Sequence, residues 1–210
     1  MTNLRSLVQE VAKPWDKSPY YENAEKLTHI FWGDSSKFKP LFEKLDLTVT
    51  LELACGHGRH AEIVQPMAGK LILMDVFQDN LDVCKRRLSD KSNVVYLLGN
   101  GFSFDPVEDR TVSAIYCYDA MVHFAPKLVE SYIKDVSRVL KPGGMALFHH
   151  SNYVAPVNQH YGRNPNARNK MTRDLFNSYA KGVKLDIVEA FEMSWGGHTD
   201  LDGVTLLRRT

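Results

Sequence analysis

Residues 51–61 read LELACGHGRHA, in which Gly56 and Gly58 stand between an apolar run and a segment of helical character. A strand, a glycine-rich turn and a helix in this order form the usual ligand-binding edge of an open α/β sheet. Small residues let the backbone approach a ligand there, and the helix N-terminus offers free N–H groups. The glycines alone would also fit a simple tight turn, so a ligand site needs a second signal.

Short β-rich runs and helical stretches alternate over the rest of the chain, which is the pattern of a mostly parallel sheet. The predicted strands cover 49–53, 70–75, 94–98, 112–118, 145–150, 183–191 and 204–208. The predicted helices cover 59–67, 78–88, 127–140 and 172–181. The sequence LKPGG at 140–144 predicts a turn from a helix into a strand, because its two glycines accept positive φ.

About 45 residues with helical periodicity precede the first predicted strand. They carry an aromatic cluster, interrupted by prolines: Trp15, Tyr20, Tyr21, Phe31 and Trp32. We interpret this segment as a helical cap over the carboxyl ends of the strands. The chain is then one domain over 1–210, with a cap at 1–45, a ligand-binding core at 46–150, and a substrate-side insertion with the C-terminal strands at 151–210.

The charge is nearly balanced, with 26 Lys and Arg against 25 Asp and Glu. Such a chain has no strong field to attract a nucleic acid or an anionic membrane, so neither is an expected partner. No uncharged apolar run approaches the ~18–20 residues of a membrane span, and no export signal is recognised. The three cysteines, Cys55, Cys84 and Cys117, fit neither a disulfide framework nor a zinc site, which indicates a cytoplasmic location.

The second signal for a ligand is Asp75, which ends the next predicted strand roughly 20 residues after the glycines, where a carboxylate can bind both hydroxyls of a ribose. The glycines and Asp75 together predict an adenosine-type ligand, and two classes of ligand remain possible, a dinucleotide and an adenosine that carries an amino-acid tail. Gly56, Gly58 and Ala61 also satisfy the G-x-G-x-x-A pattern of nicotinamide-dependent oxidoreductases. Glu52, in contrast, suits an ammonium group and would repel a pyrophosphate.

Residues 46–150 resemble the class I S-adenosylmethionine (SAM)-dependent methyltransferases. The first motif of that family is similar to Glu52-Leu-Ala-Cys-Gly-His-Gly58, with Ala54 where the family often has a glycine. Its ribose-binding acid is similar to Asp75, and its Gly-Asp element is similar to Gly99-Asn100, in which Asn100 keeps an acceptor oxygen. The LKPGG turn resembles the family's turn before the fifth strand.

The resemblance implies an enzyme with SAM as cofactor. It also implies a Rossmann-like fold: a seven-stranded, mostly parallel sheet with helices on both faces, an antiparallel last strand and an N-terminal helical cap. The residues expected to bind the cofactor are Glu52, Ala54, Cys55, Gly56, Gly58, Asp75, Val76, Phe77, Asn100, Gly101, Phe102 and Tyr118. Among them, Val76 or Phe77 would pack on the adenine.

Methyl transfer from a sulfonium mainly requires alignment of the acceptor, and a base only for acceptors such as an aliphatic hydroxyl. The predicted strand ends bring His123, His149 and His150 near the donor, and Asp119 could hold an imidazole or contact the donor's amino acid. His149 and His150 point to opposite sides of a strand, so at most one faces the site. His57 and His60 are expected at the surface.

No Asp-Asp or Asp-Asn pair follows the fifth strand, so no metal site is predicted.

Acceptor recognition is expected from the cap and from the long insertion at 151–174. The candidate residues are Tyr20, Tyr21, Trp32, Tyr153, Tyr161, Arg163 and Arg168. This mixture of rings and guanidinium groups suits a sugar or a compact anionic metabolite, although a solvated basic loop and an aromatic packing core explain it equally well.

The sequence thus predicts a monomeric or homodimeric enzyme that methylates a small molecule, preferably O-methylation of a sugar or secondary metabolite. The alternatives are N-methylation of a small amine, methylation of a nucleic acid or protein, an NAD-dependent oxidoreductase, and a non-catalytic SAM-binding subunit.

Overall fold

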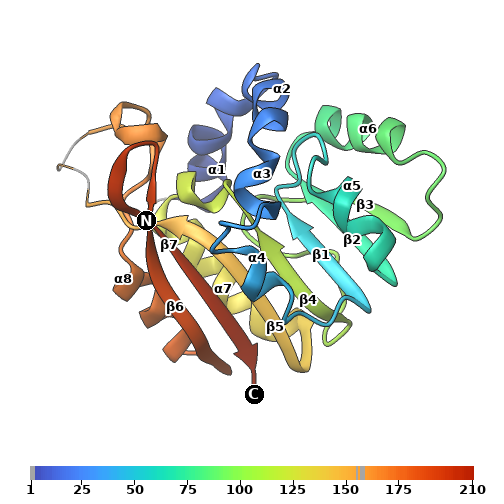
Figure 1. Ribbon diagram of the computed structural model, residues 1–210. Helices are drawn as coiled ribbons and strands as arrows, with labels where there is room; N and C mark the ends of the chain where they lie inside the picture. The colour runs from blue at the N-terminus through green and yellow to red at the C-terminus, as the bar shows by residue number, and fades with distance from the viewer. Residues whose placement is uncertain (1–2, 155, 157–158) are drawn as a thin grey trace.

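A seven-stranded sheet forms the centre of the structure, a computed structural model that describes residues 3–154, 156 and 159–210 (Figure 1). The strands in chain order are β1 Val49–Leu53, β2 Lys70–Asp75, β3 Val94–Leu98, β4 Val112–Cys117, β5 Leu140–Ser151, β6 Leu185–Trp195 and β7 His198–Arg209. Their order across the sheet is β3-β2-β1-β4-β5-β7-β6. Strands β1 to β5 pair in parallel, and β7 runs antiparallel between β5 and β6, which confirms the predicted fold class.

The last three strands are longer than the sequence predicts. Strands β6 and β7 are joined through Gly196 and Gly197, which have φ of 55° and 82°. A two-residue turn of this handedness matches the twist of paired strands, so the pairing continues up to Trp195 and His198. Strand β5 already begins at Leu140, and the glycines of the predicted turn form its bulged start beside β4.

Helices cover both faces of the sheet, as predicted. They are α1 Leu4–Ala12, α2 Tyr20–Ala24, α3 Thr28–Trp32, α4 Lys39–Phe42, α5 Ala61–Val64, α6 Gln78–Arg87, α7 Pro126–Val139 and α8 Arg173–Lys181. Short 3₁₀ helices lie at Lys13–Trp15, Glu25–Leu27, Gln65–Met67, Met121–His123, Tyr161–Arg163 and Pro165–Ala167. The predicted helix 59–67 is shorter than expected, because Pro66 lacks the N–H that an α-helix would need there.

The pleat of the strands divides the core into two layers. Side chains such as Leu53 and Phe148 pack with α7 and α8 on one face. Side chains such as Leu73 and Tyr116 pack with α3 to α6 on the other. In Figure 1, α7 lies behind the sheet and α4 in front of it. The central parallel strands are therefore buried on both sides, as a doubly covered sheet requires.

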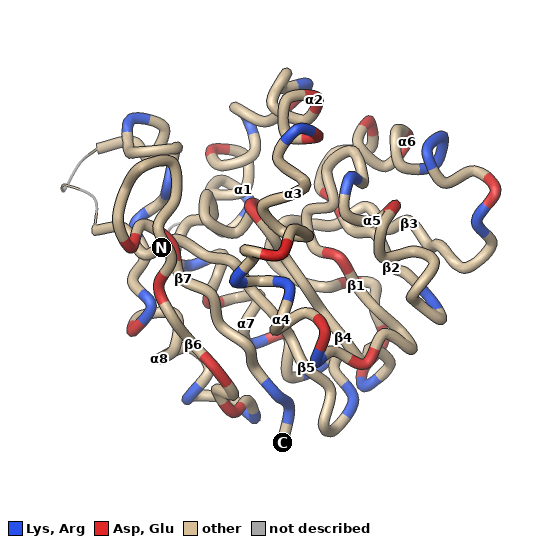
Figure 2. Tube along the Cα trace, in the orientation of Figure 1, with Lys and Arg blue, Asp and Glu red and all other residues tan. Residues whose placement is uncertain are grey.

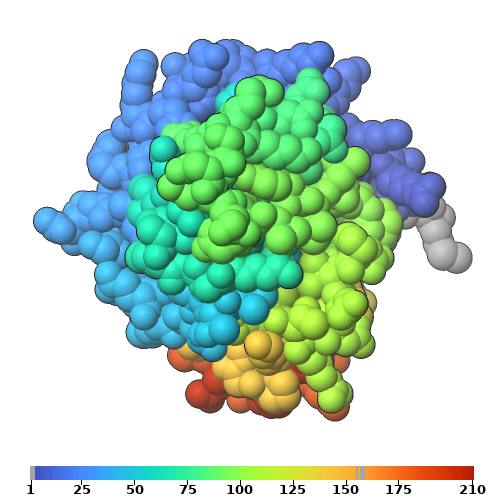
Figure 3. All heavy atoms as spheres, turned by 90° about the vertical axis from the view of Figure 1, so that its right-hand side faces the viewer, coloured from blue at the N-terminus to red at the C-terminus, as the bar shows by residue number. Residues whose placement is uncertain are grey.

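The N-terminal helices α1 to α3 form the cap and lie beyond the carboxyl ends of β1 and β4 (Figure 1). Figure 3 shows the blue N-terminal residues packed directly against the teal and green residues of the sheet region. Phe31 anchors the cap: it is fully buried and packs on Phe38, Phe42 and Tyr118. Arg87 of α6 adds ion pairs to Glu25 of the cap and to Glu62.

Positive and negative residues are interspersed over the view in Figure 2. In the part of the chain that the structure describes, no helix is long and apolar enough to cross a membrane.

Candidate functional site

A cavity opens where β1, β2 and β4 end, beneath α1 and α2 of the cap. Nine of the twelve residues expected to bind the cofactor line it: Glu52, Ala54, Cys55, Gly56, Asp75, Val76, Phe77, Gly101 and Tyr118. Gly58, Asn100 and Phe102 are outside the lining and support the loops that form it. The sequence motifs therefore meet at one edge of the sheet, as the parallel topology requires.

The glycine loop after β1 has the tight geometry that its sequence suggests. Gly56 has φ of 54°, and a Cβ there would lie 3.1 Å from the Tyr21 ring of the cap. Gly58 has φ of 77°, and a Cβ there would lie 3.0 Å from Cys84 Sγ. Ala54 also adopts a positive φ, 56°, which costs a non-glycine residue about 1 kcal/mol or more. This strain falls where the family often has a glycine.

Asp75 ties the loop to the end of β2. Its carboxylate accepts hydrogen bonds from the backbone N–H groups of Gly56 and Phe77, both at 2.9 Å, and from the Asn80 amide at 3.1 Å. Burial raises the pKa of the Asp75 carboxyl, and these hydrogen bonds partly oppose the rise. The sequence analysis missed Asn80, which also donates to the Tyr21 hydroxyl at 3.1 Å.

Glu52 lies at the base of the cavity. The Tyr116 hydroxyl donates to its carboxylate at 2.7 Å, and burial raises the pKa of Glu52 to about 8. Near pH 7 this carboxyl is therefore largely protonated, and a cation placed beside it would favour the ionised form.

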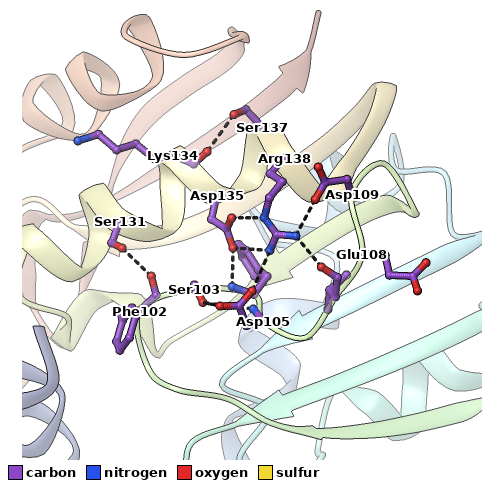
Figure 4. A network of polar contacts seen from close by, with 12 residues as sticks. Phe102, Ser103, Asp105, Glu108, Asp109, Ser131, Lys134, Asp135, Ser137 and Arg138 are labelled. Atoms are coloured by element: carbon purple, nitrogen blue, oxygen red, sulfur yellow. Dashed lines mark hydrogen bonds and ion pairs between the residues drawn. The ribbon is translucent and has the colours of Figure 1, made fainter.

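The loop after β3 is held by side chains of α7 (Figure 4). Arg138 forms a bidentate ion pair with Asp135 and also donates hydrogen bonds to Asp109 and the Val107 carbonyl. Asp135 in turn accepts from the Phe104 N–H at 2.7 Å. Such a charge-assisted cluster fixes the loop that carries Gly101 into the cavity.

Asn100 uses its side-chain oxygen inside that loop. Oδ1 accepts from the N–H groups of Phe102 and Ser103 at 2.9 and 2.8 Å. The resemblance assigns this oxygen to the adenine amino group, but here it closes an Asx turn. The backbone beside Gly101 is the part of the loop that reaches the cavity.

The end of β4 presents a second polar group, Asp119, in a left-handed conformation with φ of 56°. Its carboxylate accepts hydrogen bonds from the Tyr20 hydroxyl of the cap and from Arg59 Nη2, the latter at 3.1 Å. Arg59 also donates to the Ala24 carbonyl of the cap. These contacts join the cap to the core across the cavity. Sequence reasoning missed Arg59, although it directly follows Gly58.

Behind Asp119 lies a buried network that reaches β7. The Asp119 N–H donates to His149 Nδ1 at 3.1 Å, so His149 carries its proton on Nε2 and donates it to Asp202 at 2.8 Å. Asp202 also accepts a bidentate pair of hydrogen bonds from Arg168, at 2.8 and 2.7 Å. Arg168 Nη2 returns to within 3.7 Å of Asp119 Oδ1. His149, Arg168 and Asp202 are each at most 2% exposed.

Two of the three candidate bases do not line the cavity. His149 is held in the network just described. His150 lies on the opposite face of β5, stacks on Phe176 at 3.9 Å and bonds the Thr205 hydroxyl at 3.0 Å. Both are fully buried because β5 continues to Ser151 and β7 pairs alongside it. The end of β5 therefore does not bring these two histidines into the cavity.

His123 does line the cavity. Its Nδ1 bonds the Ala167 carbonyl at 2.8 Å, which requires the proton on Nδ1 and leaves a lone pair on Nε2. Trp15 packs on the ring at 4.3 Å. Burial and the nearby Arg168 charge lower the pKa of His123 to about 4.

His60 is another correction, because it is buried and lines the cavity instead of lying at the surface. It directly precedes α5, and its Nδ1 accepts a hydrogen bond from the Trp32 indole at 3.1 Å. His57 is half-buried, lines the cavity and stacks on Tyr21 at 4.5 Å.

The candidates for acceptor recognition separate into two groups. Tyr20 and Tyr21 line the cavity. The others lie outside the lining: Trp32 in the cap core, Tyr153 in a bridge to Lys170, Tyr161 bonded to the Val11 carbonyl, Arg163 at the surface and Arg168 in the buried network. The described residues of the insertion are thus outside the cavity lining, and three further residues, 155, 157 and 158, lie outside the described part of the chain.

Within residues 3–154, 156 and 159–210, no group of three or more His, Cys, Asp or Glu side chains is placed to hold a metal ion.

Comparison with known sequences finds that part of this chain is similar to methyltransferases. A sequence family described as a methyltransferase domain matches residues 50–144. A demethylmenaquinone methyltransferase from Staphylococcus saprophyticus is 30% identical over 103 residues, which make up 48% of this chain and 37% of that protein. The match thus spans little more than a third of that relative's length.

Solved structures share the whole fold at low identity. Geranyl diphosphate C-methyltransferase from Streptomyces coelicolor, in complex with Mg²⁺, geranyl diphosphate and S-adenosyl-L-homocysteine, aligns with a TM-score of 0.68 at 13% identity, over 93% of this chain and 85% of that one. An S-adenosylmethionine-dependent methyltransferase from Clostridium acetobutylicum aligns with a TM-score of 0.68 at 14% identity, over 91% and 99% of the two chains.

Proposed function

We propose that this chain, whose residues 50–144 match a methyltransferase-domain family, is a class I SAM-dependent enzyme that transfers a methyl group from SAM to a small molecule. The observation that carries the proposal is the glycine loop of β1 bonded to the Asp75 carboxylate on the wall of a capped cavity. The curated relative and the solved methyltransferases named above support it. Location in the cytoplasm and a monomeric or homodimeric state stay predictions from the sequence.

The donor would lie across the ends of β1 and β2. Asp75 would accept from the ribose hydroxyls, and Val76 and Phe77, which also line the cavity, would offer apolar surface to the adenine. Glu52 would accept from the donor's ammonium group. The sulfonium supplies an activated methyl group, so the main task of this chain is to hold the acceptor in line with it.

The acceptor would lie toward the cap and the end of β4. Here the cavity wall is largely aromatic, with Trp15, Tyr20, Tyr118 and Phe124 in the lining. The insertion residues that favoured a sugar, Arg163 among them, lie elsewhere. We therefore favour O-methylation of a flat, mainly apolar metabolite over that of a sugar.

Replacement of Asp75 by alanine should weaken SAM binding by about 1.5–3 kcal/mol, because a charged acceptor for the ribose hydroxyls is lost. Isothermal titration calorimetry with SAM measures the effect, and Asp79→Ala on the exposed side of α6 is a matched control. An unchanged dissociation constant would mean that the ribose lies elsewhere. Tight binding of NAD without binding of SAM would overturn the proposed function.

SAM binding should release protons at neutral pH. Glu52, with a pKa of about 8, is mostly protonated near pH 7, and an ammonium beside it stabilises the carboxylate. The donor affinity should therefore rise between pH 6 and 7.5. Calorimetry in two buffers of different ionisation enthalpy measures the released protons. The Glu52→Gln variant should lose most of this release, and an equal release from both proteins would show that the ammonium binds elsewhere.

The most direct test of the function is transfer of a labelled methyl group from SAM into the small-molecule fraction of a lysate, followed by mass identification of the product. Labelling that requires the active chain and disappears with Asp75→Ala supports the proposal. Label found only in nucleic acid or protein would contradict the small-molecule assignment.

A further inference from the structure

Three side chains of the cavity lining, Trp15, His60 and Tyr118, carry a buried polar atom without a hydrogen-bond partner among the described residues, and the rings of the last two are neighbours. His60 and Tyr118 both line the cavity and are 3% and 7% exposed. Among the described residues, neither His60 Nε2 nor the Tyr118 hydroxyl has a hydrogen-bond partner. A buried polar atom without a partner destabilises a protein, so such a pair on a cavity wall points to a ligand group that completes it.

The contact of Trp32 fixes the hydrogen-bonding role of His60. Because the Trp32 indole N–H donates to Nδ1, the neutral ring carries its proton on Nε2. Burial, with the positive charges of Arg59 and Arg87, lowers the pKa of His60 well below its usual range. His60 therefore presents an N–H donor near neutral pH, and its other nitrogen is not free to act as a base.

The Tyr118 ring lies next to this imidazole. The two rings meet edge to face with centroids 5.3 Å apart, and Phe31 stacks on the Tyr118 ring with a centroid distance of 4.8 Å. Burial raises the pKa of Tyr118, so the hydroxyl stays protonated and can donate or accept. Both atoms are thus held by rigid aromatic neighbours in one part of the wall.

The charged groups nearby are already paired with one another. Arg59 bonds Asp119, and Asp119 also receives the Tyr20 hydroxyl. A carboxylate ligand, such as the amino-acid tail of SAM, would be drawn to the Arg59 cation. An uncharged oxygen on an apolar body instead suits two neutral groups set among aromatic rings.

We infer that His60 and Tyr118 form an uncharged subsite that binds a carbonyl or hydroxyl oxygen of the methyl acceptor. The subsite makes an oxygen-bearing, mainly apolar acceptor preferable to a hydrocarbon of the same shape. A neutral hydrogen-bonding site discriminates in this way because an analogue without the oxygen leaves its polar groups unpaired. The inference deepens the proposed function and rests on it for the identity of the ligand as acceptor.

The test uses two probes of nearly equal shape, acetophenone and ethylbenzene, which differ in one carbonyl oxygen. Their binding is measured by NMR titration of the full-length protein, with and without saturating S-adenosyl-L-homocysteine. Acetophenone should bind more tightly than ethylbenzene. Tyr118→Phe and His60→Phe should each weaken acetophenone about 5- to 10-fold, the effect of one lost hydrogen bond, and leave ethylbenzene unchanged.

Further variants separate recognition from structural damage. His60→Gln can keep a donor near Nε2 and should restore much of the acetophenone affinity lost in His60→Phe. Tyr118→Phe removes a hydroxyl that has no partner among the described residues, so the melting temperature of this variant should equal or exceed that of the wild type. Tyr96→Phe on β3, outside the cavity lining, should change neither probe.

Equal affinities of wild type, Tyr118→Phe and His60→Phe for acetophenone would overturn the inference, as would no saturable binding to the wild type. Weaker S-adenosyl-L-homocysteine binding in both variants, with acetophenone unaffected, would assign the subsite to the donor and also overturn it. Failure of the wild type to bind S-adenosyl-L-homocysteine counts against the proposed function, while the acetophenone titration without it still tests the subsite.

Discussion

Replacement of His123 by alanine should lower the rate of methyl transfer about 10²–10⁴-fold for an aliphatic hydroxyl acceptor, while SAM affinity stays nearly unchanged. His123 is the one of the three predicted bases that lines the cavity, and its Nε2 keeps a lone pair because Nδ1 donates to the Ala167 carbonyl. Single-turnover kinetics with the acceptor found by the labelled-methyl screen measure the chemical step.

The pH dependence gives an independent check on this base. An imidazole acts as a base only when it is deprotonated, and burial lowers the pKa of His123 to about 4. The rate should therefore stay level from pH 8 down to about 5 and fall as the pH passes 4, instead of falling at the 6–7 of an exposed imidazole. A midpoint near 6.5 would indicate another histidine.

His29→Ala, in an exposed position of α3, is the matched control and should keep wild-type kinetics. If His123→Ala also keeps wild-type turnover, the base assignment is wrong. The acceptor is then an amine or an already acidic hydroxyl, for which alignment alone is sufficient.

The fold and the donor end of the site could be predicted because their signals are local. The glycine loop, the acid at the end of β2 and the alternation of strands with helices each occupy a few consecutive residues. The parallel topology then brings their ends to one edge of the sheet without further information. Gly56 and Asp75 consequently lie in contact, as their separate motifs suggest.

The acceptor end could not be predicted in the same way, because its contacts join distant parts of the chain. His149 is buried through Asp202, 53 residues away, and His60 is buried through Trp32, 28 residues away. Whether Arg168 faces solvent or the interior depends on the same Asp202, which only the pairing of β5 with β7 brings near. A pattern of neighbouring residues in the sequence does not predict such contacts between distant residues.

Gly203 illustrates the same limit. In sequence it is an isolated glycine directly before the predicted strand 204–208, but a Cβ at this position would lie 2.3 Å from His150 Cε1. The glycine therefore makes room for a buried histidine on the neighbouring strand. The burial of His150 and the identity of residue 203 explain each other, and neither can be understood without the register of β5 and β7.

Replacement of Asp202 by alanine should lower the free energy of unfolding by about 3–5 kcal/mol, the largest stability effect that we expect. The change leaves the Arg168 guanidinium and the His149 N–H buried without their acceptor, and an uncompensated buried charge is strongly destabilising. Urea denaturation at pH 7 measures the loss. Asp186→Ala, an exposed position on β6, should change the stability by no more than about 0.5 kcal/mol.

Acid should remove the contribution of Asp202 to the free energy of unfolding of the wild type. Burial alone would raise the pKa of Asp202, but its contacts with His149 and Arg168 outweigh burial and hold the pKa well below its usual range. A carboxyl whose pKa is lower in the folded state stabilises the protein above its unfolded pKa of about 3.9, and that stability is lost as the pH falls below it. Stability measured from pH 7 down to 2 should therefore fall more steeply in the wild type than in Asp202→Asn, which has no carboxyl to protonate. Parallel curves for the two proteins, or an unchanged urea midpoint for Asp202→Ala, would show that Arg168 and His149 find other partners and that Asp119 is held without this network.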